Sequence, residues 1–135
     1  MALISWSDTM SVGVAKIDSE HRKLIELINQ LHGHMLEGKS NEVMGKVLDS
    51  LIGYTKTHFA AEEALFRAHK YPQASEHKQE HDALTKKVLE LQVEFKAGRA
   101  LIGAPVLGFL RDWLTQHILK VDMAYRVFFA DKGVK

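Results

Sequence analysis

Histidine and carboxylate side chains recur in this sequence at a spacing of four residues. His58 is followed by Glu62, and His77 by His81, in stretches whose apolar residues repeat with the period of an α-helix. Residues four apart lie on one face of a helix, so each pair presents two coordinating side chains together. Imidazole and carboxylate groups suit iron, manganese and zinc. The spacing therefore indicates a metal-binding function.

The apolar stripes of two further segments lead to the same residue types. The stripe that begins at Leu24 leads back to His21, and the stripe through Trp113 leads on to His117. Asp122 follows five residues after His117, and five residues advance an ideal helix by about 500°. His117 and Asp122 should therefore approach a site from different sides, or a π-helical bulge should bring them together.

Seven of these side chains are expected to converge inside one bundle: His21, His58, Glu62, His77, His81, His117 and Asp122. Burying so many polar groups is costly unless something satisfies them, and two divalent cations would do so. Two octahedral ions have about twelve coordination positions. Two bridging carboxylates, the histidines and a bridging oxide or hydroxide leave one position open for a small diatomic ligand.

The elements that must position these side chains are helices. Pro72 and Pro105 each mark a break between long segments of helical periodicity, Asp18 and Ser40 are candidate N-caps, and no alternating β pattern occurs. We predict an all-α, up-down-up-down four-helix bundle with an irregular N-terminal arm. The arm is expected at residues 1–17, and the helices at residues 19–37, 41–70, 73–97 and 105–129.

Composition narrows the functional class. The 135 residues suit one domain, 1–135, and the formal net charge of +1 is scattered, which argues against nucleic acid as a partner. The absence of cysteine excludes thiolate ligands, disulfides and iron–sulfur clusters. No signal peptide or membrane span is evident, so we expect a cytoplasmic protein, and a monomer because no large apolar surface is evident.

Four motifs carry a resemblance to a known family. The stretches "VGVAKIDSEH", "HFAAEE", "YPQASEHKQEH" and "WLTQHILKVD" together resemble the hemerythrins, especially the single-domain bacterial members. The similarity covers nearly the whole chain, and all seven candidate ligand positions carry the expected residue types.

The resemblance implies a non-haem di-iron centre that binds O2 reversibly. His77, His81 and His117 would hold one iron, His21 and His58 the other, and Glu62 and Asp122 would bridge them, together with an oxide or hydroxide. The iron with two histidines would carry the open position. Family comparison also implies an apolar oxygen pocket bordered by Phe59, Trp113, Leu114, Ile118 and Leu119.

Oxygen carriage, storage or scavenging is the function that the resemblance implies, without enzymatic activity and with an oxygen-consuming protein as a further partner. An oxygen or redox sensor is one alternative, although such sensors are usually fused to signalling domains. A di-iron enzyme that handles peroxide or nitric oxide is another. Iron storage would require a bundle richer in carboxylates.

The remaining titratable residues near these motifs are expected to lie outside the site. Glu63 is turned by about 100° from Glu62 on an ideal helix, so it should face solvent. His32, His34 and His69 are most simply surface or helix-end residues.

Overall fold

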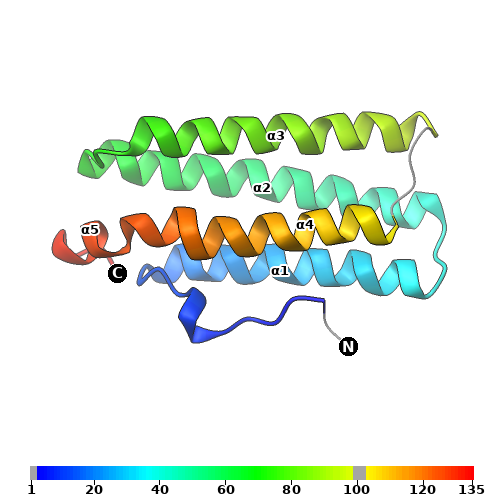
Figure 1. Cartoon of the computed structure of the whole chain (residues 1–135), viewed down its shortest axis with the longest axis horizontal. Coiled ribbons are helices and arrows are strands. Elements are labelled where there is room, and N and C mark those ends of the chain that lie inside the picture. The colour runs from blue at the N-terminus through cyan, green and yellow to red at the C-terminus, as the bar shows by residue number, and fades with distance from the viewer. Residues whose placement is uncertain (1–2, 99–102) are drawn as a thin grey trace.

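The computed structural model describes residues 3–98 and 103–135, and these residues form helices and connecting turns without a strand. Four long helices, α1 (Ala15–Leu36), α2 (Asn41–His69), α3 (Ala74–Lys96) and α4 (Ala104–Gln116), run alternately up and down (Figure 1). A π-helical turn (His117–Val121), a 3-10 turn (Asp122–Tyr125) and α5 (Arg126–Asp131) continue the line of α4. The predicted four-helix bundle is confirmed. None of the helices in the described part of the chain combines the length and apolar content needed to cross a membrane.

The first helix starts earlier than its predicted start at residue 19. It begins at Ala15, and its N-cap residue, Val14, provides no side-chain hydrogen bond. The Asp18 carboxylate instead accepts hydrogen bonds from the Val12 backbone N–H at 2.9 Å and from the Ser11 hydroxyl at 2.5 Å. The prediction that Asp18 caps the helix was therefore wrong. Its carboxylate satisfies the turn that leads into the helix.

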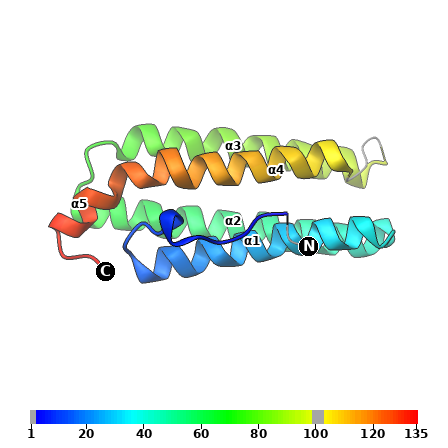
Figure 2. The same ribbon diagram turned by 60° about the horizontal axis from the view of Figure 1, so that its bottom comes forward.

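The N-terminal arm packs along α1, where Figures 1 and 2 show it as the dark blue segment. The Ile4 backbone N–H donates to the Asn29 side-chain oxygen at 2.9 Å, and the Asn29 amide donates to the Ile4 carbonyl at 2.8 Å. The Arg22 guanidinium lies 4.6 Å from the centroid of the Trp6 ring. These contacts and the burial of Met10 fix the arm against the bundle.

The second and fourth helices begin and end with the local signals that the sequence carries. Ser40 caps α2 by accepting a hydrogen bond from the Val43 N–H at 3.3 Å. Lys70 ends α2 in the left-handed region, with φ of 55°. Pro105 lies in the first turn of α4, where its missing N–H removes no helical bond.

The buried apolar residues form two clusters that lie at different levels of the bundle. The larger cluster includes Leu24, Phe59, Leu84 and Leu114, one from each long helix. The smaller cluster consists of Val12, Val14, Ile17, Phe66, Tyr71, Tyr125 and Phe129. On each helix the candidate site residues fall between members of the two clusters. The fold therefore encloses a polar layer between two apolar layers.

Candidate metal centre

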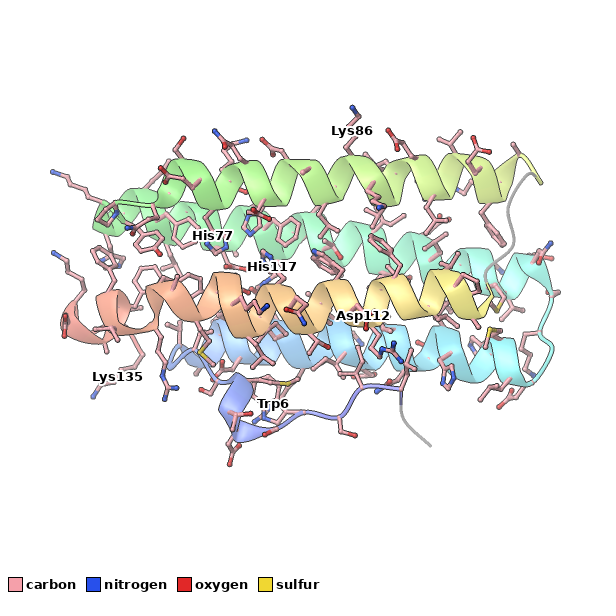
Figure 3. All side chains as sticks on the ribbon, viewed as in Figure 1. Trp6, His77, Lys86, Asp112, His117 and Lys135 are labelled. Carbon is pink, nitrogen blue, oxygen red and sulfur yellow. The ribbon has the colours of Figure 1, made fainter. Side chains whose placement is uncertain are left out.

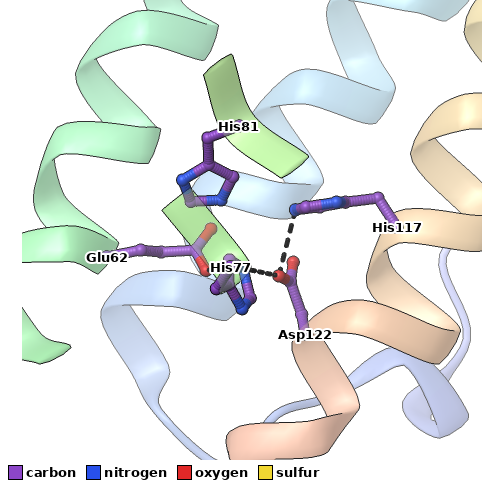
Figure 4. A group of neighbouring side chains, drawn as sticks. All are labelled: Glu62, His77, His81, His117 and Asp122. Atoms are coloured by element: carbon purple, nitrogen blue, oxygen red, sulfur yellow. Dashed lines mark ion pairs between the residues drawn. The ribbon is translucent and has the colours of Figure 1, made fainter. Parts of the chain in front are cut away.

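The helices α1, α2 and α3 and the turns that follow α4 contribute the side chains of this polar layer. His21 comes from α1, His58 and Glu62 from α2, and His77 and His81 from α3, while His117 and Asp122 follow the end of α4. Each of the seven is at most 5% exposed. Figure 3 labels His77 and His117 inside the bundle, and Figure 4 shows five of these side chains facing a common centre.

Two groups of these residues have the geometry to hold a metal ion. One contains Glu62, His77, His81, His117 and Asp122, and the other contains His21, His58, Glu62 and Asp122. Within each group one potential ligand atom per residue lies within 4.8 Å of all the others. The two groups share both carboxylates, so the layer has the form of two adjoining cation sites.

Each carboxylate directs its two oxygens toward different groups. For Asp122, Oδ2 lies 2.9 Å from His21 Nε2, while Oδ1 lies 2.9 Å from His77 Nε2 and 3.1 Å from His117 Nε2. For Glu62, Oε1 lies 2.5 Å from His58 Nε2, and Oε2 lies 3.5 Å from His77 Nε2. A carboxylate with one oxygen toward each site is placed to bridge two ions.

A π-helical turn brings the last two side chains together. It covers His117–Val121, and the Asp122 N–H bonds to the carbonyls of His117 and Ile118. The bond to a residue five positions earlier adds one residue to the turn and returns the chain to the same face. Of the two geometries left open by the five-residue spacing, the bulge is the one observed.

The nitrogen and oxygen atoms of the layer are placed to bind a cation rather than to form hydrogen bonds with one another. The Nε2 atoms of all five histidines and all four oxygens of Glu62 and Asp122 are buried without a hydrogen-bond partner of suitable geometry. Several N–O distances are short, but the atoms point toward a shared centre. Buried polar atoms of this kind are costly when unsatisfied. Positive ions with nitrogen and oxygen ligands would satisfy them.

Electrostatics keep the two shared carboxylates ionised. Burial and the neighbouring Asp122 charge would raise the pKa of Glu62, but the His58 charge and the polar atoms of the nearby His21 and His58 rings lower it to about 2. Burial likewise opposes ionisation of Asp122, yet His117 and the other histidines hold its pKa well below the usual value. Both groups are therefore anionic at neutral pH, as a bridging ligand must be.

Burial lowers the pKa of two of the histidines, but neighbouring carboxylates reverse the net shift at one of them. Burial lowers the pKa of His81 below its ordinary value, which favours the neutral ring that binds metals. Burial also acts to lower the pKa of His58, but the charge of Glu62 and the hydrogen bond to Glu20 raise it to about 10.

Two carboxylates outside the seven lie against the site, and the prediction that Glu63 faces solvent was wrong. Glu63 Oε2 lies 2.8 Å from His81 Nδ1, and Glu20 Oε1 lies 2.7 Å from His58 Nδ1. A helical wheel gives the direction of Glu63 from its own axis but not the position of α3. The signal available in the sequence is that each glutamate directly adjoins a predicted ligand, Glu20 before His21 and Glu63 after Glu62.

The residues expected at the oxygen pocket differ in burial. Phe59, Leu114 and Ile118 are buried, and the Phe59 ring stacks on the His81 ring with centroids 3.8 Å apart. Trp113 is half-buried beside His117, with ring centroids 5.6 Å apart. Leu119 is 41% exposed and lies mainly at the surface, and its place at the border of the pocket stays a prediction. It directly follows Ile118, whose side chain takes the inward face of the turn.

Two surface hollows reach the outer edges of ligand rings. One of about 420 Å³ is lined by His117, Trp113 and Glu80, among others, and one of about 220 Å³ is lined by His77, Tyr71 and Glu80, among others. Both lie where residues of α3 meet the α4–α5 segment. On this side the site is separated from solvent by little more than the imidazole rings.

The other histidines and Tyr125 do not join the two groups. His32, His34 and His69 are partly exposed and belong to neither metal-binding group among the described residues. Tyr125 is fully buried, and its ring centroid lies 5.6 Å from that of His77. Burial and the Asp122 charge raise the pKa of Tyr125 well above its ordinary value, so its phenol stays protonated.

Comparison with known proteins gives a consistent set of similarities. A family model described as the hemerythrin HHE cation binding domain matches residues 12–126. The chain is 37% identical over 126 residues to a bacteriohemerythrin of Methylococcus capsulatus (strain Bath), covering 93% of this chain and 95% of that protein. It is also 37% identical over 125 residues to a bacteriohemerythrin of Stenotrophomonas maltophilia (strain R551-3), covering 93% and 80%.

The same similarity extends to three dimensions. A crystal structure of wild-type hemerythrin superposes with a TM-score of 0.89 at 35% identity, and the match covers 93% of this chain and 97% of that one.

Proposed function

Because this chain belongs to the hemerythrin family of cation-binding domains, we propose that it binds O2 reversibly at a pair of iron ions. The observation that carries the proposal is the pair of overlapping ligand groups that share Glu62 and Asp122. One group has three histidines and the other has two. The two sites share both carboxylates and differ by one histidine, so the ion with two histidines would have an open coordination position.

The proposed ligand assignment follows the two groups. His77, His81 and His117 hold one ion, His21 and His58 hold the other, and Glu62 and Asp122 span both. A bridging oxide or hydroxide would complete the pair. When bound, two ferrous ions supply the two electrons that O2 binding requires.

Apolar side chains around the proposed open coordination position would exclude water from it. Phe59, Leu114 and Ile118 form apolar walls beside the ligand layer. A dry surrounding limits proton access and so slows the loss of electrons from the ferrous state. Trp113 covers part of the remaining side, where the hollow at His117 meets solvent.

Binding is favoured over catalysis by the ligand count. Two carboxylates among seven ligands supply little negative charge, so the site stabilises highly oxidised iron less than a carboxylate-rich site would. A single open position leaves no place on the ions for a second substrate. A sensor function and a peroxide- or nitric-oxide-handling function would use the same site, and of these the peroxide-handling enzyme is the one that an optical titration separates from carriage.

An anaerobic optical titration tests the proposal. Iron is added to the metal-free protein under reducing conditions, O2 is admitted, and the sample is then purged with inert gas. A visible charge-transfer band that appears with O2 and disappears on purging supports carriage. Irreversible oxidation on first exposure would contradict it, and sustained peroxide release would favour the enzyme. Retention of zinc or manganese alone by the purified protein would remove the basis for oxygen chemistry.

A further inference from the structure

Two carboxylates that are not part of the seven-residue layer each hold the outer nitrogen of a buried histidine. Glu20 on α1 lies 2.7 Å from His58 Nδ1 on α2, and Glu63 on α2 lies 2.8 Å from His81 Nδ1 on α3. The histidines are 1% exposed, whereas the Glu20 and Glu63 side chains are 13% and 18% exposed. Each contact therefore joins a buried ring to a partly hydrated anion on the neighbouring helix.

The remaining histidines of the layer lack such a partner. His21 Nδ1 is buried without a hydrogen bond, and no carboxylate in residues 3–98 or 103–135 bonds to Nδ1 of His77 or His117. The two contacts are also divided between the two ligand groups, because His58 belongs to one and His81 to the other. This distribution gives one outer carboxylate to each ligand group.

We propose that Glu20 and Glu63 are positioning residues that set the balance between ferrous and ferric iron, one carboxylate for each ion. The inference rests on the proposed di-iron function. A ring that donates its Nδ1–H to an anion has Nε2 free to bind metal, and it donates more electron density through Nε2. That electron density stabilises the ferric ion more than the ferrous ion.

The inference also ranks the two residues. His58 lies in the group with two histidines, where the open position is proposed, so Glu20 acts on the ion that meets O2. Removing the Glu20 charge should therefore weaken O2 affinity more than removing the Glu63 charge. Removing either charge should shift the iron pair toward the ferrous state.

Glutamine and alanine variants separate charge from orientation. In Glu20→Gln and Glu63→Gln the amide oxygen still accepts the Nδ1–H, so ring orientation is kept while the charge is lost. In Glu20→Ala and Glu63→Ala both are lost. Outer partners of metal-binding histidines contribute roughly 10–100-fold in metal affinity. We expect the alanine variants to lose metal affinity within that range and the glutamine variants to lose less.

The midpoint potential of the iron pair is the decisive measurement. We expect each glutamine variant to increase the preference for ferrous over ferric iron by roughly tenfold, the lower end of the range given above for outer partners. A tenfold change corresponds to a midpoint potential raised by about 59 mV for one electron. Glu26→Gln on α1 and Glu42→Gln on α2 are matched controls, because both carboxylates are exposed and pair with lysine. A thermal melt of each variant checks folding.

Competition between a chelator and the protein for Zn2+ provides a second arm that needs no oxygen chemistry. Weaker Zn2+ binding in the alanine variants, with raised potentials in the glutamine variants, supports the inference. Potentials and Zn2+ affinities equal to those of the control variants would overturn it. If the wild-type protein fails to bind O2 while the Zn2+ arm behaves as expected, the proposed function fails and the positioning role of the carboxylates remains.

Discussion

At the scale of single residues, the two adjacent glutamates of α2 have different tasks. Glu62 directs its oxygens toward both ligand groups, whereas Glu63 reaches across to the outer nitrogen of His81. An ideal helix separates the directions of neighbouring residues by about 100°. Here that angle is small enough for one side chain to enter the layer and the next to support it from outside.

Glu62→Ala should prevent stable binding of a pair of ions. The change removes an anionic oxygen from both ligand groups and leaves buried histidines facing each other without compensation. We expect iron content after desalting to fall from about two ions per chain to fewer than one, whereas Glu42→Ala leaves it unchanged. Metal analysis of the purified proteins measures the difference. Two ions retained in Glu62→Ala would contradict the bridging assignment.

Phe59→Leu should shorten the lifetime of the oxygenated protein. The substitution keeps an apolar side chain but removes the ring that stacks on His81, so water gains access to the layer. Partial loss of a buried aromatic ring costs on the order of 2 kcal/mol of folding stability. The time course of bleaching in air measures the lifetime.

Phe95→Leu is the control for that experiment. Phe95 is buried in the same larger cluster but lies near the end of α3, outside the ligand layer. It should lower stability by a similar amount without changing the bleaching rate. Equal bleaching rates in both variants would show that Phe59 does not protect the site.

At the scale of elements, the sequence predicts which helix positions face inward but not how neighbouring helices contact one another. Extending the apolar stripe from Leu24 to His21, and from Trp113 to His117, identifies inward positions because helical period is a local property. The reach of Glu63 to His81 depends on how α2 packs against α3, which local spacing does not contain. The geometry after His117 is not contained in local spacing either, since the five-residue step to Asp122 allows two arrangements, and the start of α1 at Ala15 goes with the arm turn that Asp18 satisfies.

The π-helical turn offers a test of what aligns His117 with Asp122. Deleting Leu119 converts the five-residue spacing into four, and four residues of α-helix also return to the same face. We expect the deletion variant to retain iron, whereas insertion of an alanine after Leu119 should abolish retention. Iron content and far-ultraviolet circular dichroism check the site and the fold. Loss of iron in the deletion variant would show that the bulge itself, rather than the alignment, is required.

At the scale of the whole molecule, the ligand layer divides the interior into two apolar clusters. The larger cluster fills most of the bundle, and the smaller one joins the start of α1, the α2–α3 connection and the C-terminal turns. The seven side chains of the layer between them contain ten buried atoms without hydrogen-bond partners: five Nε2 nitrogens, His21 Nδ1 and four carboxylate oxygens. Cations would therefore contribute to the stability of the fold as well as to its chemistry.

Removing the metal should lower the melting temperature of the wild-type protein. Free metal at one hundred times its dissociation constant stabilises a folded protein by about 2.7 kcal/mol, which corresponds to roughly 10 °C for a chain of this size. Thermal melts with and without a strong chelator measure the difference. Glu62→Ala is the control, since its melting temperature should not respond to the chelator. An unchanged wild-type melting temperature would argue against a filled layer.

The irregular segment after α4 has a consequence for the order in which the molecule opens. Its π-helical and 3-10 turns interrupt the regular backbone hydrogen bonds, and within residues 3–98 and 103–135 no outer carboxylate holds His117. Segments of this kind exchange their amide hydrogens through low-energy local opening. Metal would therefore act as a cross-link that couples this segment to α1, α2 and α3. Hydrogen–deuterium exchange should show its largest metal-dependent slowing in residues 117–125.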